Sequence, residues 1–318
     1  MWAQAQPNIA LVKYWGKSNV ARNLPAVGSL SITLDTLYTR MSVSLLDDPG
    51  SDKLTVNGDE NTEMLARVSG CIDLITGTDR GAARVQSEAN FPVAAGLASS
   101  ASAFAALVTA TYECTGKTAD ALTMARIAGT VSGSAARSLY GGFVELSADA
   151  DDIDVWPIAE AKDWPLKVIV AVTETEAKAV SSGEAMIRGA ETSPFYDSWV
   201  DRQSEDLTAA RIAVENRDFE QLAAVSEHNC LKMHTVMWTS RPPIVYWNSA
   251  TLACMEAVRE LQKKAEPVFF TIDAGPQLKA VCLPSAEVVV RDTLAGIDGV
   301  VKTYSSGLGL GARVVEQP

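Results

Sequence analysis

The sequence predicts an α+β protein built from two halves. One observation is a series of short strand patterns separated by turn residues in the first half, and a second is a set of long amphipathic stretches after residue 181. The third is an acidic segment, 149–154, with Pro157 and Pro165 close behind it. A solvated charged segment is the best candidate for a boundary between the halves, although a hairpin tip is the alternative.

Each expected element follows from its own pattern. Strands are expected where polar and apolar residues alternate, or where a short apolar run ends at turn residues, namely at 10–12, 28–34, 39–46, 53–56, 83–89, 143–146, 166–172, 268–272, 280–283, 300–304 and 312–315. Helices are expected where apolar residues recur at helical intervals, namely at 60–76, 92–107, 118–129, 181–190, 197–214, 219–235, 243–264 and 285–294.

Composition indicates an ordinary globular chain with an acidic surface. Of its 318 residues, 47% are hydrophobic and 21% are charged, which is a balance that folds into a sizeable core. The net charge of −12 repels nucleic acid and anionic membranes, so we expect neither as a partner. An anionic substrate would need a local basic pocket.

The cysteines and histidines favour neither disulfides nor a transition metal. The 5 cysteines are widely spaced and mostly in apolar surroundings, as in a reduced cytoplasmic protein. His228 and His234 do not have the spacing of a helical zinc pair. Residues 1–7 lack the features of a signal peptide, and no apolar run is long enough to cross a membrane.

The stretch 92–107 has the composition of a loop that enters a buried helix. Pro92 and Gly96 come first, and Ser99, Ser100 and Ser102 follow within the first expected turn. The first N–H groups of a helix lack internal partners and carry a positive dipole, so a small-residue loop there favours phosphate binding. A serine-capped core helix is the alternative.

Two further segments combine cations with small or aromatic residues. Segment 13–17 places Lys13 and Lys17 around Tyr14 and Trp15, which suits an anionic ligand walled by rings. Segment 132–142 places Arg137 among glycines and serines, which leaves room for a phosphate or carboxylate. The alternatives are a surface strand end with extended lysines and a flexible connector with a surface arginine.

A last pair of segments completes the inventory. Asp273 ends an apolar strand and precedes an Ala-Gly-Pro turn, so it is either used chemically or caps a helix. Ser181 and Ser182 open another hydroxyl-rich helix. Since no histidine or cysteine falls within these clusters, the residues favour phosphoryl chemistry run by positioning and electrostatics.

Four of these segments together resemble one family. The phosphate loop 92–102 is similar to that of the GHMP kinases, and segments 8–17, 132–142 and 273–276 resemble diphosphomevalonate decarboxylases. The resemblance spans nearly the whole chain, because segments 180–182 and 193–196 also match. It implies the two-part GHMP-kinase fold, with a ribosomal-S5-like N-terminal half at 1–165 and a ferredoxin-like α/β C-terminal half at 166–318. The active site is then expected in the cleft between the halves.

The resemblance also implies an activity. It is the ATP-dependent decarboxylation of mevalonate 5-diphosphate to isopentenyl diphosphate, a step of the mevalonate pathway in isoprenoid biosynthesis. The 3-hydroxyl is phosphorylated, phosphate leaves, and carbon dioxide is lost. ATP and Mg²⁺ are the implied cofactors, the cytoplasm is the implied location, and a homodimer is the implied assembly.

Site residues carry over by position in these segments. Asp273, Lys13 and Arg137 match the catalytic positions, with Lys13 expected near Asp273 and Arg137 on the substrate carboxylate. The substrate-binding positions are Tyr14, Trp15, Lys17, Ser132, Gly133, Ser134, Ser181 and Ser182. The nucleotide-binding positions are Ser87, Asn90, Pro92, Gly96, Leu97, Ala98, Ser99, Ser100 and Ser102, with Ser100 also expected on the metal.

Three positions depart from the family pattern. Val27 and Gln277 each replace an asparagine, and Ser18 stands where arginine is frequent. A decarboxylase of mevalonate 5-monophosphate, or another GHMP small-molecule kinase, is therefore the alternative reading. Asp273 favours decarboxylation over phosphorylation alone.

Overall fold

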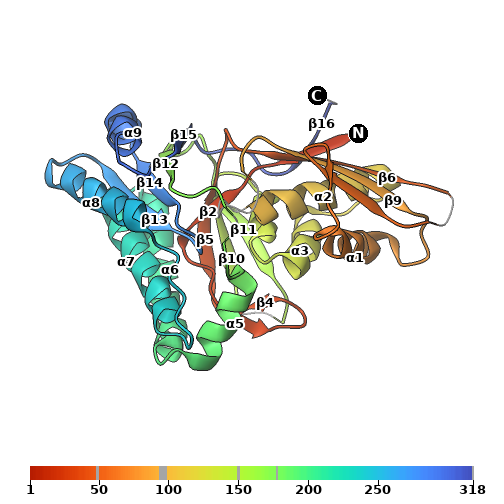
Figure 1. Cartoon of the computed structure of the whole chain (residues 1–318), viewed down its shortest axis with the longest axis horizontal. Helices are drawn as coiled ribbons and strands as arrows, with labels where there is room; N and C mark the ends of the chain where they lie inside the picture. Colours follow the sequence, from red (N-terminus) through yellow and green to blue (C-terminus); the bar gives the residue numbers. More distant parts are fainter. Residues whose placement is uncertain (48–49, 93–98, 149–150, 177, 317–318) are drawn as a thin grey trace.

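A computed structural model of the chain describes residues 1–47, 50–92, 99–148, 151–176 and 178–316. Its first half lies on one side of the molecule and the long helices of its second half on the other (Figure 1). A four-stranded sheet stands between them. The α+β class predicted from the sequence is confirmed.

The outer sheet of the first half has the strand order β16-β1-β6-β9-β7-β8. Its strands are β1 (Trp2–Ala5), β6 (Thr39–Leu45), β7 (Lys53–Val56), β8 (Asp59–Glu60), β9 (Ala83–Ala89) and β16 (Arg313–Val315). Neighbours are antiparallel except β7 and β9, which are parallel. Trp2 pairs with Val315, so the last strand returns to the first and both chain ends lie together (Figure 1).

Helices cover one face of this sheet. They are α1 (Leu65–Thr76), α2 (Ser99–Thr115), α3 (Ala121–Val131) and the short α4 (Ala135–Ser138). Helix α2 lies against β1 and β6 and is buried on nearly every side, because alanines and Phe104 let its neighbours approach closely. This packing fixes the position of the first turn of α2, which begins at Ser99.

The central sheet has the order β11-β10-β5-β2 and is antiparallel throughout. Its strands are β2 (Asn8–Val12), β5 (Ser29–Thr33), β10 (Phe143–Ser147) and β11 (Asp154–Ala159); a small hairpin of β3 (Lys17–Asn19) and β4 (Leu24–Pro25) follows β2. Because Ser147 pairs with Asp154, the acidic segment 149–154 joins two neighbouring strands. The segment is therefore the connection of a hairpin, which is one of the two forms expected for it, and the boundary between the halves stays a prediction; residues 149 and 150 themselves lie outside the described residues.

The second half is a sheet covered by helices. The sheet has the order β13-β14-β12-β15, with β12 (Lys167–Val172), β13 (Val268–Ile272), β14 (Leu278–Cys282) and β15 (Lys302–Ser306). The helices are α5 (Ser182–Thr192), α6 (Tyr196–Asn216), α7 (Phe219–Trp238), α8 (Ser249–Lys263), the 3₁₀ turn η1 (Pro284–Ala286) and α9 (Glu287–Ala295). In the described ranges no helix combines the length and apolar composition that crossing a membrane requires.

The two halves share a hydrophobic core. Ile9 and Leu30 of the central sheet lie in one buried cluster with Leu207 of α6 and Phe269 of β13. Helix α6 packs on β2 and β5, and α7 packs on β2 and β13. The end of β2 and the end of β13 are therefore held close together, as burial of this apolar surface requires.

Several helix starts differ from those expected, those of α1 and α8 by five residues or more. Helix α1 begins at Leu65 instead of residue 60, because Glu60 belongs to the β7–β8 hairpin. Helix α8 begins at Ser249 instead of residue 243, because Asn248 and Thr251 form a reciprocal capping box there. Strands β1, β3, β4, β8 and β11 were not predicted.

Candidate active site

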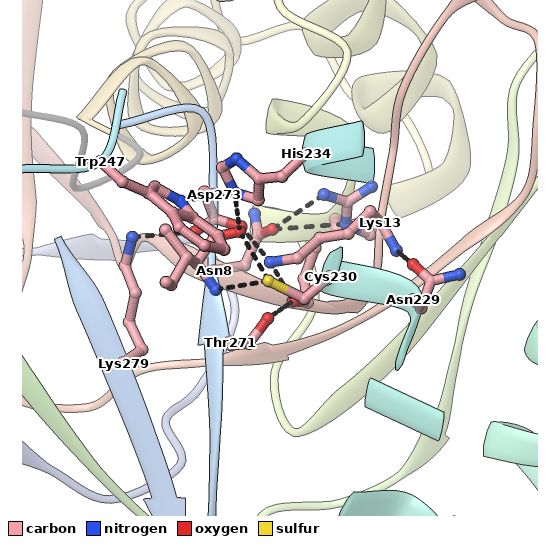
Figure 2. Close-up of polar contacts among 12 residues, drawn as sticks. Asn8, Lys13, Asn229, Cys230, His234, Trp247, Thr271, Asp273 and Lys279 are labelled. Atoms are coloured by element: carbon pink, nitrogen blue, oxygen red, sulfur yellow. Dashed lines mark hydrogen bonds and ion pairs between the residues drawn. The ribbon is translucent and has the colours of Figure 1, made fainter. Parts of the chain in front are cut away.

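Lys13 and Asp273 meet where β2 and β13 end. Lys13 Nζ lies 2.6 Å from Oδ1 of Asp273 and donates to the carbonyl oxygen of Ala10 at 2.9 Å. The Lys13 side chain is 1% exposed, whereas that of Asp273 is 25% exposed, so the carboxylate is the part that a ligand can reach. The expected proximity of Lys13 and Asp273 is confirmed (Figure 2).

A second lysine contacts the same carboxylate. Lys279 of β14 places Nζ 3.1 Å from Oδ2 of Asp273 (Figure 2). Burial raises the pKa of Asp273, but the ammonium groups of Lys13 and Lys279 outweigh burial and hold that pKa well below its usual range. Asp273 is therefore an ionised carboxylate at neutral pH. The sequence signal for Lys279, a lysine inside an apolar strand, was overlooked.

Side chains from the second half fix the backbone of Lys13. Asn229 of α7 accepts a hydrogen bond from Lys13 N at 2.7 Å, and Gln203 of α6 donates to Lys13 O at 2.7 Å. Asn229 also donates to Gln203 at 2.8 Å, so both amides belong to one buried network. Such long-range amide contacts leave no motif in the sequence, and neither residue was expected.

Arg137 lies on α4, buried between the central sheet and Tyr14. Its guanidinium donates to Ser29 Oγ at 2.6 Å and to Asn8 Oδ1 at 3.2 and 3.3 Å, and it lies 5.8 Å from the centre of the Tyr14 ring. Burial lowers the pKa of Arg137 to about 10, so it stays charged at neutral pH.

Gly133 allows the Tyr14 ring to lie close to segment 132–137. A Cβ at this position would lie 2.3 Å from Tyr14 Oη.

The helix start expected to bind phosphate adjoins this cluster. Ser99 and Ser100 begin α2, and Ser132 Oγ donates to Ser100 Oγ at 3.3 Å. Ser102 instead turns inward, where its hydroxyl lies 2.7 Å from that of Thr39. Gly96, Leu97 and Ala98 lie outside the described residues. Segments 99–100 and 132–137 are thus joined, as their predicted roles require.

The third hydroxyl-rich helix start lies beside the Asp273 turn. Ser181 caps α5 by accepting from Glu184 N at 3.2 Å. Lys178 Nζ donates to Ser182 Oγ at 2.6 Å and to the carbonyl of Ala274 at 2.7 Å. Burial, reinforced by the charge of Lys279, lowers the pKa of Lys178 to about 8. Lys178 was not predicted, although it precedes the Ser-Ser pair by only three residues.

Other predicted residues lie at the edge of the cluster or in the core. Lys17 lies near a second cation, Arg67. Burial and the charge of Arg67 both lower the pKa of Lys17. Trp15 is 1% exposed within the core and accepts a hydrogen bond from Trp199 through its carbonyl at 3.1 Å. Ser134 caps α4 through its backbone, and its carbonyl accepts from Asn8 at 2.9 Å.

Three of the residues expected to bind the nucleotide, Ser87, Asn90 and Pro92, form a separate group on and after β9. Ser87 pairs with Met41 in the outer sheet. Asn90 accepts from Tyr38 N at 2.8 Å and donates to Thr36 O at 2.8 Å, and Pro92 follows it. In the residues that the structure describes, no hydrogen bond or ion pair links this group to Asp273.

Three departures from the family pattern have structural explanations. Val27 is buried in the core, and Ser18 Oγ donates to the carbonyl of Pro25 at 2.8 Å. Gln277 is fully buried, and its side chain accepts from Thr173 N at 2.6 Å. Gln277 therefore braces the end of β12.

Two α+β halves that share a core, with a hydroxyl-rich helix start beside a buried lysine–aspartate pair, define a protein of the GHMP-kinase type. Family models narrow this class. Residues 5–156 match the diphosphomevalonate decarboxylase-like N-terminal domain, and residues 168–301 match the mevalonate 5-diphosphate decarboxylase C-terminal domain. The chain belongs to the diphosphomevalonate decarboxylase family.

Individual relatives agree with this membership. The chain is 32% identical to diphosphomevalonate decarboxylase mvd1 of Aspergillus fumigatus, covering 93% of this chain and 80% of that protein. It is 32% identical to the human diphosphomevalonate decarboxylase, covering 86% and 74%. The solved mevalonate diphosphate decarboxylase of Staphylococcus aureus superposes with a TM-score of 0.92 at 33% identity, covering 99% and 97%. A structure described as MDDEF in complex with MVAPP, AMPPCP and magnesium superposes with a TM-score of 0.91 at 32% identity, covering 99% and 98%.

Proposed function

We propose that this chain catalyses the ATP-dependent decarboxylation of mevalonate 5-diphosphate to isopentenyl diphosphate, with release of ADP, phosphate and carbon dioxide. The observation that carries this proposal is the ionised Asp273 held by Lys13 in a chain of the diphosphomevalonate decarboxylase family. The complex of the MDDEF relative with MVAPP, AMPPCP and magnesium supports the same substrates and Mg²⁺.

The chemistry divides into two bond-breaking stages. The 3-hydroxyl oxygen attacks the γ-phosphorus of ATP and ADP leaves. The hydroxyl proton passes to an oxygen of the transferred phosphoryl group, and the hydroxyl becomes a phosphate ester. The ester C–O bond then breaks and phosphate departs with the electron pair, which leaves positive charge on carbon 3. Cleavage of the bond to the carboxylate supplies the electrons of the new double bond and releases carbon dioxide.

Asp273 suits both stages because it stays ionised. An ionised carboxylate accepts the hydrogen bond of the 3-hydroxyl and orients that oxygen toward the phosphorus. The same negative charge stabilises the positive charge that develops on carbon 3. The low pKa of Asp273 makes orientation its principal task, since a weakly basic carboxylate is a poor acceptor for a whole proton.

Arg137 is assigned to the substrate carboxylate. Its planar guanidinium suits two-point binding of a carboxylate, and Asn8 and Ser29 hold it in one orientation. A carboxylate held apart from water until phosphate leaves loses carbon dioxide only when carbon 3 can receive the electrons. The departure of phosphate therefore sets the order of the two stages, and the guanidinium holds the carboxylate in place until then.

The remaining residues are assigned to the phosphates. For the substrate diphosphate these are Tyr14, Lys17, Ser132, Gly133, Ser134, Ser181 and Ser182, with Trp15 supporting them from the core. For ATP they are Ser87, Asn90, Pro92, Gly96, Leu97, Ala98, Ser99 and Ser100. Ser102, also expected there, is buried against Thr39 and can support this helix start only from the core. The lowered pKa of Lys17 beside Arg67 supports the binding of an anion here, because a phosphate reduces the repulsion between two neighbouring cations.

Ser100 is assigned to Mg²⁺. Among the described residues no group of three or more His, Cys, Asp or Glu side chains is arranged to hold a metal. A hydroxyl at the start of α2 fits the way Mg²⁺ binds with nucleotides, where phosphates and water supply most ligands. When bound, Mg²⁺ neutralises phosphate charge during transfer.

We keep three further expectations as proposals. The first is a division into an N-terminal domain at 1–165 and a C-terminal domain at 166–318. The second is a cytoplasmic location, supported by the free cysteines, 4 of which are buried. The third is a homodimer, which light scattering after size-exclusion chromatography tests directly.

The activity is tested by measuring ADP and trapped carbon dioxide with MgATP on mevalonate, its 5-phosphate and its 5-diphosphate. One carbon dioxide per ADP on the diphosphate supports the proposal. Preference for the monophosphate would correct the substrate. ADP without carbon dioxide on every substrate would overturn decarboxylation in favour of a small-molecule kinase.

A further inference from the structure

Lys279 is buried in the interior of a sheet, which is an unusual place for an ammonium group. It pairs with Thr271 of β13 and with Val170 of β12, so its strand has neighbours on both sides. Its side chain is 0% exposed. A buried ammonium requires a close opposite charge, and Asp273 Oδ2 at 3.1 Å supplies it.

Lys279 and Lys13 contact different oxygens of one carboxylate. Lys13 approaches Oδ1 from the end of β2, and Lys279 approaches Oδ2 from β14 (Figure 2). Contacts on both oxygens oppose rotation of the carboxylate about its Cβ–Cγ bond. Such support restricts a reactive group to one geometry.

Lys279 is too deeply buried to contact a substrate. The Asp273 side chain is 25% exposed, whereas Lys279 is fully covered. Lys279 therefore acts on a substrate only indirectly: it forms an ion pair with Asp273, and its charge also lowers the pKa of Lys178.

The charges around Asp273 explain why a second lysine is useful. Phosphates and a substrate carboxylate bring negative charge to the site, which favours protonation of Asp273. A buried cation on Oδ2 opposes that protonation without competing for the anions. The titratable or charged groups that act on this site from the surrounding elements are Lys13 after β2, Tyr14, Arg137 on α4, Lys178 before α5, Cys230 and His234 on α7, and Lys279 on β14.

Three of these groups carry no charge at neutral pH, and one of them is Tyr14, whose pKa burial raises to about 12. Burial lowers the pKa of His234 to about 3, and burial raises the pKa of the Cys230 thiol. None of the three supplies the counter-charge that Lys279 supplies.

We propose that Lys279 is a positioning residue of the reaction: it holds Oδ2 of Asp273 and keeps this carboxylate ionised and oriented while the anionic substrates are bound. The proposal rests on the function proposed above. It assigns a role to a residue that lies outside all the motifs described from the sequence.

The first test is Lys279→Met, which keeps an unbranched chain of similar length and removes the charge. We expect kcat to fall about 100-fold with KM values for both substrates nearly unchanged, because a misplaced reactive group costs about this much. We also expect the acid limb of the kcat–pH profile to move to higher pH, since Asp273 then protonates more easily. Lys279→Arg should return the limb toward its wild-type position.

Lys167→Met is the matched control. Lys167 lies in the same sheet but pairs with Glu287 at 3.3 Å, away from Asp273. It should leave kcat and the pH profile unchanged. Wild-type kcat and an unshifted acid limb in Lys279→Met would overturn the proposal.

A readout that needs no activity separates this proposal from the function. In protein carrying ¹³C at aspartate carboxyls, the Asp273 signal, assigned with Asp273→Asn, should titrate at higher pH in the Lys279 variant. An unchanged titration overturns the positioning role whatever the substrate proves to be. If Lys279→Met does not fold, Lys279→Gln serves in the same titration with the same two outcomes.

Discussion

Lys13 Nζ lies 2.6 Å from Asp273 Oδ1, although the two residues are 260 positions apart in the chain. The contact joins the residues that directly follow β2 and β13, and both strands contribute to one shared hydrophobic core. Packing of the two halves is thus what brings Lys13 to Asp273, and the ammonium group of Lys13 helps to keep this carboxylate ionised.

Arg137→Lys tests the assignment to the substrate carboxylate. Lysine keeps the charge but loses the planar fork, so we expect kcat/KM for mevalonate 5-diphosphate to fall about 100-fold while ATP affinity changes little. Steady-state kinetics and ATP titration by calorimetry measure the two effects. Arg126→Lys is the control, because Arg126 is 40% exposed and pairs with Asp152 at 3.4 Å. Equal kinetics in the two variants would contradict the assignment.

Gly133→Ala tests the close approach of Tyr14 to segment 132–137. The added Cβ would lie 2.3 Å from Tyr14 Oη, so the ring must move away from Arg137. We expect kcat/KM to fall about 10- to 100-fold. The control is Gly70→Ala, where the added Cβ meets nothing within 4 Å in helix α1. It should keep full activity and raise the free energy of unfolding by about 0.5–1 kcal/mol. Full activity of the Gly133 variant would show that the ring is not constrained there.

His234 should make the protein less stable in mild acid. Burial lowers its pKa to about 3 from an ordinary value of 6.5, so the unfolded chain binds a proton that the folded chain refuses. The contribution of neutral His234 to the free energy of unfolding is complete above pH 6.5 and is lost as the pH falls. The loss amounts to about 2 kcal/mol at pH 5.

Urea unfolding at pH 7 and pH 5 measures this effect. The loss of stability between the two pH values should be smaller in His234→Gln than in wild type. His228→Gln, at an exposed position on the same helix, should retain the wild-type loss. The same pH dependence in all three proteins would show that His234 is not held neutral.

The class of fold and the candidate site residues that stand in recognisable motifs could be predicted from the sequence. Asp273 was expected because an acid at the end of an apolar strand is costly unless it is used. The proximity of Lys13 followed only from the family resemblance, since no pattern within the chain predicts a contact over such a separation. The end of α1 was found because its apolar period continues to Thr76, whereas its start depended on strand pairing by Glu60.

The residues that hold Lys13 and Asp273 in place could not be predicted from the sequence, for a physical reason. Asn229 and Gln203 fix Lys13 through single long-range hydrogen bonds, and neither stands in a recognisable motif. Lys279 had a local signal, but a lysine in a strand is usually an edge or surface residue. Only the packed structure shows that it faces Asp273.

Asp273→Asn tests the central claim most directly, with turnover of mevalonate 5-diphosphate and ATP affinity measured on the same preparation. We expect ATP affinity to stay close to wild type and turnover to fall by at least about 1,000-fold, because the amide cannot carry the negative charge. Asp298→Asn, an exposed position in the same half, should behave as wild type. Near-normal turnover in Asp273→Asn would contradict the assignment of the reaction to this carboxylate.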